Sequence, residues 1–157
     1  STWYDHVESF IGVSGQADGI PHLPDGLFQP PFEMNAAEKY FKKTVEEKYP
    51  GRKVIMGRTA NLTLPLPGRA LCQSRNSCQR GCSYGAYFST LSSTLPAARA
   101  TGKVTVLTNA MVNRIIYDDK KERATGVEVI DTTSKQSREY FARILFINAS
   151  TLGTTAI

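Results

Sequence analysis

The segment of residues 103–131 constrains the fold most, because apolar and polar residues alternate along it with the period of a β-strand. A run rich in β-branched residues covers 112–117, a charged and polar turn follows at 118–122, and a second alternating run covers 124–130. Two alternating runs joined by a polar turn are typical of a β-hairpin. The sequence therefore predicts an antiparallel hairpin here.

Two further strands are expected around the hairpin. The alternation at 104–106 predicts a short strand before it, and the apolar run at 144–147 predicts an extended strand after it. That second run ends on the small residues Asn148, Ala149 and Ser150. A strand that ends on small residues allows a ligand to approach the backbone closely, as in many nucleotide-binding sheets. A helix is expected to follow, with its first turn at 154–157.

Three stretches carry a resemblance to a known family. They are AARATGKVTVLTNAMVNRIIYD, ATGVEVID and ILFINASTLGTTAI, and the stretch YDHVESFIGVSG near the start agrees with them. In order and spacing they resemble the glucose–methanol–choline (GMC) oxidoreductases, flavoenzymes that oxidise alcohols and sugars with FAD. The resemblance implies an α/β fold: a partial Rossmann-like FAD-binding domain with a β-meander over 103–142, plus helical and loop segments that border a substrate domain.

The resemblance also implies cofactor-binding residues. The backbone of Val112 would bind the adenine edge of FAD, while Asn148, Ala149 and Ser150 would lie against the ADP moiety. The residues alone favour an ordinary core valine at Val112, and the order of the family motifs reverses that interpretation. In the family, the glycine-rich pyrophosphate turn and the catalytic histidine occupy other regions. We therefore expect a central piece of such an enzyme, inactive alone, with no catalytic residue or metal ligand assigned in it.

The resemblance divides the chain at about residue 70. Residues 1–70 would supply helix and loop segments at the substrate-domain border, and residues 71–157 would belong to the FAD-binding domain, with the cysteine segment and the β-meander. The expected substrate is a small alcohol or sugar. The electron acceptor, the compartment and the oligomeric state stay open. The alternative hypothesis is a non-catalytic structural or binding domain that shares the β-meander.

Local signals predict three helices and one more strand. Thr2 is expected to cap a helix that ends near Gly12, and Asn35 with Glu38 forms a capping box for a second helix. Ser93 or Thr94 would cap a third helix, which ends before Gly102. The apolar stripe of the second helix predicts core packing and comprises Ala37, Tyr40, Phe41 and Val45. Residues 53–56 predict a short strand.

All three cysteines of the chain, Cys72, Cys78 and Cys82, fall within eleven positions. A structural zinc site takes four ligands, and neither histidine is near in sequence. A disulfide would leave one cysteine over. An iron–sulfur cluster needs clustered thiolates, and some membrane-associated sugar dehydrogenases that resemble this family carry one in such a region. In many relatives a further cysteine stands where this chain has Arg75, and that difference weakens the case for a metal. The remaining alternative is a compact loop with small, partly buried thiols, which we favour.

Composition excludes several classes of function. The net charge of +5 and pI near 9.2 come from basic residues spread along the chain among acidic ones, which does not favour nucleic-acid binding. No apolar run reaches the roughly 18 residues of a membrane span. The sequence shows no set of serine, histidine and aspartate residues that would indicate hydrolase chemistry.

Overall fold

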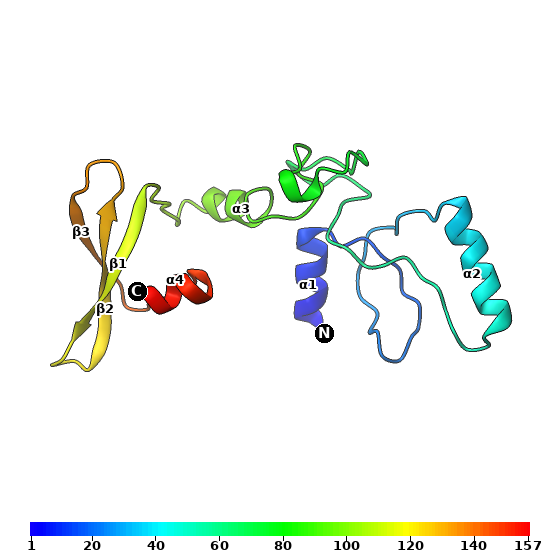
Figure 1. Ribbon diagram of the computed structural model, residues 1–157, viewed down its shortest axis with the longest axis horizontal. Helices are drawn as coiled ribbons and strands as arrows, with labels where there is room; N and C mark the ends of the chain where they lie inside the picture. The colour runs from blue at the N-terminus through cyan, green and yellow to red at the C-terminus, as the bar shows by residue number, and fades with distance from the viewer. The chain divides into compact units, whose positions relative to one another are not determined.

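The computed structural model describes residues 1–157 and divides into two compact units, Ser1–Val104 and Thr105–Ile157 (Figure 1). The elements in chain order are α1 (Thr2–Ile11), α2 (Ala36–Lys48), the 3₁₀ turn η1 (Cys78–Arg80), α3 (Thr94–Ala100), β1 (Ala110–Asp118), β2 (Arg123–Asp131), β3 (Ser137–Phe141) and α4 (Ser150–Ala156). The mixture of helices and strands agrees with the predicted α/β class. The assignment of 1–70 and 71–157 to different domains stays a prediction. None of the helices is both long and apolar enough to cross a membrane.

The second unit is built on a three-stranded antiparallel sheet in the order β1-β2-β3. Val112 lies opposite Val129, and Ile115 lies opposite Val127, so the apolar residues of the two alternating runs face each other. Val129 in the middle strand is buried. The predicted hairpin and β-meander are therefore confirmed.

Aspartates fix both turns of this sheet. Asp118 accepts hydrogen bonds at Oδ1 from the backbone N–H groups of Lys120 and Lys121, each at 3.1 Å. Asp131 Oδ1 likewise accepts from the backbone N–H groups of Thr133 at 2.9 Å and Ser134 at 2.8 Å. Such bonds from an aspartate to the backbone a few residues on are why this residue type favours turns. They lower the pKa of the Asp131 carboxyl below its ordinary value.

The two strands expected on either side of the hairpin do not form. Residues 104–106 and 144–147 lie outside every strand, and Ile144 and Phe146 are 71% and 81% exposed. A strand needs a partner for its backbone groups, and neither segment pairs with the free edge of β1 or β3. The predicted helix does follow, but α4 begins at Ser150 rather than at 154.

In the first unit, α1 ends where Gly12 adopts a left-handed conformation with φ of 77°. A side chain at Gly12 would also collide with the terminal methyl of Leu62, which is fully buried. Glycine is therefore required both by the backbone and by the packing. The predicted cap by Thr2 is wrong, because Ser1 is the cap residue and no side chain bonds to the first turn.

Helix α2 begins with the predicted capping box. Asn35 Oδ1 accepts from the backbone N–H of Glu38 at 3.0 Å, and Glu38 Oε2 accepts from the backbone N–H of Asn35 at 2.8 Å. The predicted core packing of its apolar stripe is wrong in this chain, since Tyr40 and Phe41 are 73% and 59% exposed. Periodicity identifies an apolar face, but it does not say which segment covers that face.

The predicted strand at 53–56 is also wrong. The backbone N–H of Val54 donates to Glu46 Oε1 at 3.2 Å, and its carbonyl accepts from Lys42 Nζ at 2.6 Å. Side chains of α2 thus satisfy the backbone groups that a sheet neighbour would otherwise pair. Helix α3, in contrast, ends as predicted, because Gly102 has φ of 67° and its N–H donates to the Arg99 carbonyl at 3.0 Å.

Candidate functional site

Val112 lies in β1, which is an edge strand because it pairs only with β2. The pairing register shifts between Val112 and Arg114, so Asn113 forms a bulge with no partner in β2. An edge strand leaves alternate backbone N–H and C=O groups free, and a bulge redirects the groups beside it. The position of Val112 is therefore compatible with a backbone contact to a ligand.

Glu128 of β2 holds this bulge in place. Its Oε1 accepts from Asn113 Nδ2 at 3.0 Å, and its Oε2 accepts from Arg114 Nε at 2.8 Å. Arg114 also forms an ion pair with Glu128 at 2.7 Å through its second nitrogen, so the guanidinium binds one carboxylate oxygen twice. The Arg114 hydrogen bond, followed by the Asn113 bond, lowers the pKa of the Glu128 carboxyl below its ordinary value.

This arrangement predicts an acid-dependent contribution to stability. A carboxyl whose folded-state pKa lies below its unfolded value stabilises the fold above the unfolded pKa, and that contribution is lost as pH falls through the folded pKa. Glu128→Gln should therefore destabilise the protein at neutral pH and reduce the loss seen on acidification. Urea denaturation at neutral and acidic pH measures both effects. Glu122→Gln, an exposed change in the β1–β2 turn, is the control, and an equal pH response in both variants would contradict the role of Glu128.

The segment of Asn148, Ala149 and Ser150 precedes and opens α4, and all three residues are exposed. Ala149 N–H donates to Thr154 Oγ1 at 3.1 Å, and Ser150 has φ of 65°, which is rare for a residue other than glycine. Ala149 also faces Gly153, where an added Cβ would stand 3.2 Å from the Ala149 methyl. The segment thus presents small side chains on a tightly turned backbone.

Val112 and residues 148–150 share the second compact unit. The structure shows no hydrogen bond between them, and α4 does not pack extensively on the sheet. What the two places offer is main chain outside regular pairing: Val112 lies on an edge strand beside a bulge, and residues 148–150 are small and exposed. That is the environment expected of residues that contact a dinucleotide through their main chain, so the residues present fit the adenine side of FAD.

Arg69 is a central residue of the first unit that sequence analysis does not identify. It is only 5% exposed, and its guanidinium donates to three backbone carbonyls: Ile11 at 2.7 Å, Gly85 at 2.7 Å and Ala86 at 3.2 Å. It therefore ties the end of α1 to residues 85 and 86. Burial lowers the pKa of the Arg69 guanidinium, and the nearby Cys82 acts in the opposite direction. The local feature that could have pointed to Arg69 is the turn that places Leu66 opposite Arg69 in an antiparallel bridge.

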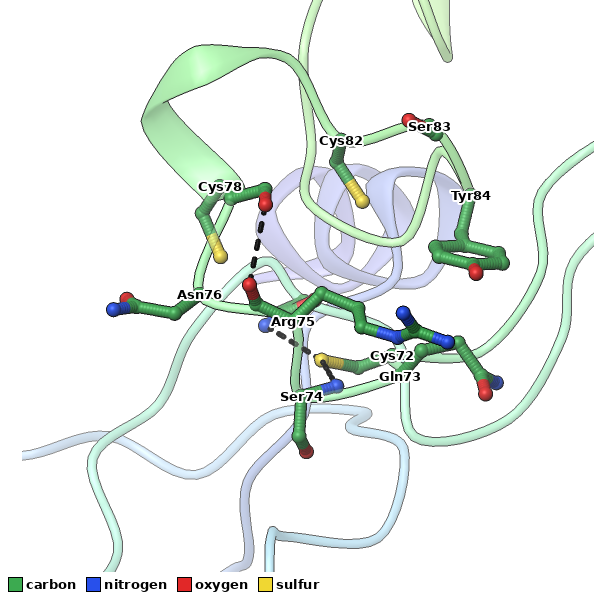
Figure 2. A pocket seen from close by; sticks show the side chains of 11 residues that line it. Cys72, Gln73, Ser74, Arg75, Asn76, Cys78, Cys82, Ser83 and Tyr84 are labelled. Carbon is green, nitrogen blue, oxygen red and sulfur yellow. Dashed lines mark hydrogen bonds between the residues drawn. The ribbon is translucent and has the colours of Figure 1, made fainter.

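The three cysteines line one pocket of about 330 Å³ (Figure 2). The other lining residues are polar or aromatic: Asn61, Gln73, Ser74, Arg75, Asn76, Ser77, Ser83 and Tyr84. All three thiols are free and half-buried. Cys72 Sγ accepts hydrogen bonds from the backbone N–H of Ser74 at 3.4 Å and from Asn61 Nδ2 at 3.6 Å.

Cys82 lies close to several backbone N–H groups. The backbone N–H of Tyr87, followed by those of Tyr84, Ala86 and Gly85, lowers the pKa of the Cys82 thiol despite its partial burial. The structure contains no group of three or more histidine, cysteine, aspartate or glutamate side chains placed to hold a metal ion.

Comparison with known proteins identifies the family. The family model described as GMC oxidoreductase, which represents the FAD-binding domain, matches residues 37–157. The match includes the three cysteines, Val112 and residues 148–150. Among curated proteins, none matches this sequence significantly. Because the family match covers most of the chain, this protein belongs to the GMC oxidoreductases, a family of FAD-dependent flavoproteins, and contains part of their FAD-binding domain.

Proposed function

We propose that this chain supports the adenine side of FAD in an oxidoreductase that acts on CH–OH groups of small alcohols or sugars. The observation that carries the proposal is the family match over residues 37–157. Oxidation of an alcohol removes a proton from oxygen and a hydride from carbon, and FAD, when bound, supplies the hydride acceptor that side chains lack. The role of the present residues is to bind and orient that cofactor.

The proposed contact at Val112 uses the main chain. A valine suits this role because its side chain packs in the sheet while its backbone faces a ligand at the free edge of β1. The bulge at Asn113, held by Glu128, supports the local geometry. Val112→Ile adds one methylene and leaves the backbone unchanged, so it should be mild.

The proposed contact at Asn148, Ala149 and Ser150 depends on small size. A large side chain at Ala149 would occupy the space where backbone and ADP must nearly touch. Because Ala149 is exposed, a larger side chain at this position can extend into solvent in the protein without FAD. A substitution there should therefore affect cofactor binding more than folding.

Ala149→Leu in the FAD-loaded protein should weaken FAD binding several-fold or more. Overpacking penalties of about 1–3 kcal/mol set this scale. Flavin absorbance after gel filtration gives the FAD occupancy, and circular dichroism shows whether each variant is folded. Ala156→Leu makes the same change at an exposed position near the end of α4 and should retain its flavin.

A folded Ala149→Leu protein with wild-type FAD occupancy would show that this segment does not border the cofactor. If the full-length protein that contains this chain bound no FAD and oxidised no alcohol or sugar with an artificial electron acceptor, the alternative of a non-catalytic domain that shares the β-meander would be favoured. The two experiments thus separate an error in the site from an error in the function.

A further inference from the structure

The bulge in β1 determines which way Val112 faces. Val112 lies opposite Val129 of β2. Arg114, two residues further along β1, lies opposite Glu128, the neighbour of Val129, so β1 has one residue more than β2 over this stretch. A shift of one residue in register turns a strand residue to the other face of the sheet. If Arg114 kept its partner and the bulge were lost, Val112 would lie opposite Ile130 and would be turned over, together with its N–H and C=O groups.

One side chain of β2 binds both residues of the bulge. Glu128 accepts from Asn113 Nδ2 at 3.0 Å through one carboxylate oxygen, and from Arg114 Nε at 2.8 Å through the other. The Glu128 side chain is only 17% exposed, so these bonds lie in surroundings where a hydrogen bond is stronger than in water. The carboxylate therefore stabilises the arrangement in which β1 carries its extra residue.

The third strand gives this carboxylate no cation to bind instead. Glu139 of β3 lies directly opposite Glu128, and like charges in that position repel each other. Attraction toward β1 and repulsion from β3 thus act in the same direction on the Glu128 carboxylate. Arg114 is the cation that offsets its charge.

We propose that Glu128 is a positioning residue for adenine recognition, because it fixes the bulge that sets the direction of the Val112 main chain. This inference rests on the proposed function, in which the Val112 backbone bonds to the adenine edge of FAD. In it, Glu128 acts through Asn113 and Arg114 rather than on the ligand. A backbone N–H or C=O bonds to a ring edge only where it points at that edge, since hydrogen bonds weaken steeply with angle.

Two nucleotides that differ only in their base report this alignment. Adenine presents an amino donor beside a ring-nitrogen acceptor, whereas hypoxanthine has a carbonyl acceptor beside a ring N–H donor. ADP and IDP otherwise have the same ribose and phosphates. A main chain aligned with adenine leaves its polar groups unpaired against hypoxanthine, which is the strongest way for a site to reject an analogue. The ratio of the two affinities therefore measures how the main chain is positioned.

The experiment uses the full-length protein that contains this chain, freed of FAD, and lets ADP or IDP compete with FAD for rebinding, followed by flavin fluorescence. The unaltered protein should bind ADP several-fold more tightly than IDP. Glu128→Gln cannot accept at both oxygens, so the preference for ADP should fall several-fold, chiefly through weaker ADP binding. Glu139→Gln makes the same change on the neighbouring strand and is the matched control, which should retain the preference.

The outcomes separate an error in this inference from an error in the proposed function. A folded Glu128→Gln protein with the wild-type preference, or with an equal loss of affinity for both nucleotides, would overturn the positioning role. A protein that binds neither FAD nor ADP before any substitution would overturn the proposed function itself. If circular dichroism shows that Glu128→Gln does not fold, Asn113→Ala, which removes one bond of the bulge, should shift the preference in the same direction to a smaller extent. An unchanged preference in that variant would also contradict the inference.

Discussion

Replacement of Arg69 by methionine is expected to lower the free energy of unfolding by about 3–5 kcal/mol, the scale for removing a charged partner from a buried network. Methionine fills a similar space, but it leaves the carbonyls of Ile11 and Gly85 without a donor, and the Ala86 carbonyl keeps only its bond from the Leu62 N–H. A buried carbonyl without a partner loses the hydrogen bond that water supplies in the unfolded chain. Denaturant unfolding followed by circular dichroism measures the loss.

Two further variants test the reason for this effect. Arg52 is exposed and its guanidinium has no hydrogen-bond partner, so Arg52→Met should change stability by no more than about 0.5 kcal/mol. Arg69→Lys keeps the charge, but a single ammonium cannot reproduce the three bonds of a planar guanidinium, and it should recover only part of the loss. Equal stability of Arg69→Met and Arg52→Met would mean that the three carbonyl contacts contribute nothing.

Gly126→Ala is expected to disrupt the pairing of β2 with β3 and to cost about 1–3 kcal/mol, the usual range for overpacking. Gly126 lies opposite Phe141, and an added methyl group would collide with the backbone carbonyl of Tyr140 and stand 2.9 Å from a ring carbon of Phe141. The Tyr140 carbonyl belongs to β3, which is paired with β2, so it cannot move away without straining the bonds between these strands. Thermal unfolding and amide hydrogen exchange over β3 measure the effect.

Gly57→Ala is the matched control for this prediction. Gly57 is exposed, no heavy atom lies within 4 Å of an added Cβ, and its φ is not in the left-handed region. The same methyl group should therefore be neutral or slightly stabilising there, because alanine restricts the unfolded chain. A Gly126→Ala protein with unchanged stability and unchanged exchange over β3 would show that the sheet tolerates the collision.

Local chemistry made part of this fold predictable from the sequence. The capping box of Asn35 and Glu38, the left-handed helix ends at Gly12 and Gly102, and the β1–β2 hairpin all depend on residues close together in the chain. Their bonds form within a few residues or across one short turn, so the pattern contains the information needed. The family resemblance, which the match over 37–157 confirms, rests in the same way on the order of short motifs.

Contacts between residues far apart in the chain decided the features that the sequence pattern did not predict. Residues 144–147 have the composition of a strand but no strand to pair with, and Val54 bonds to side chains of α2 instead of to a sheet. In the candidate site, the sequence resemblance selected Val112, whereas the bulge and the Glu128 contacts beside it emerged only from the strand register.

The sequence by itself determined the family, the hairpin and the clustering of the three cysteines along the chain. Only the tertiary structure decided that Arg69 joins Ile11 to residues 85 and 86, and that Cys72 accepts a hydrogen bond from Asn61 in a pocket that all three cysteines line. The physical reason is that a buried hydrogen bond depends on where the fold places its acceptor. The neighbours of an arginine or a cysteine along the chain do not indicate where its hydrogen-bond partner will lie.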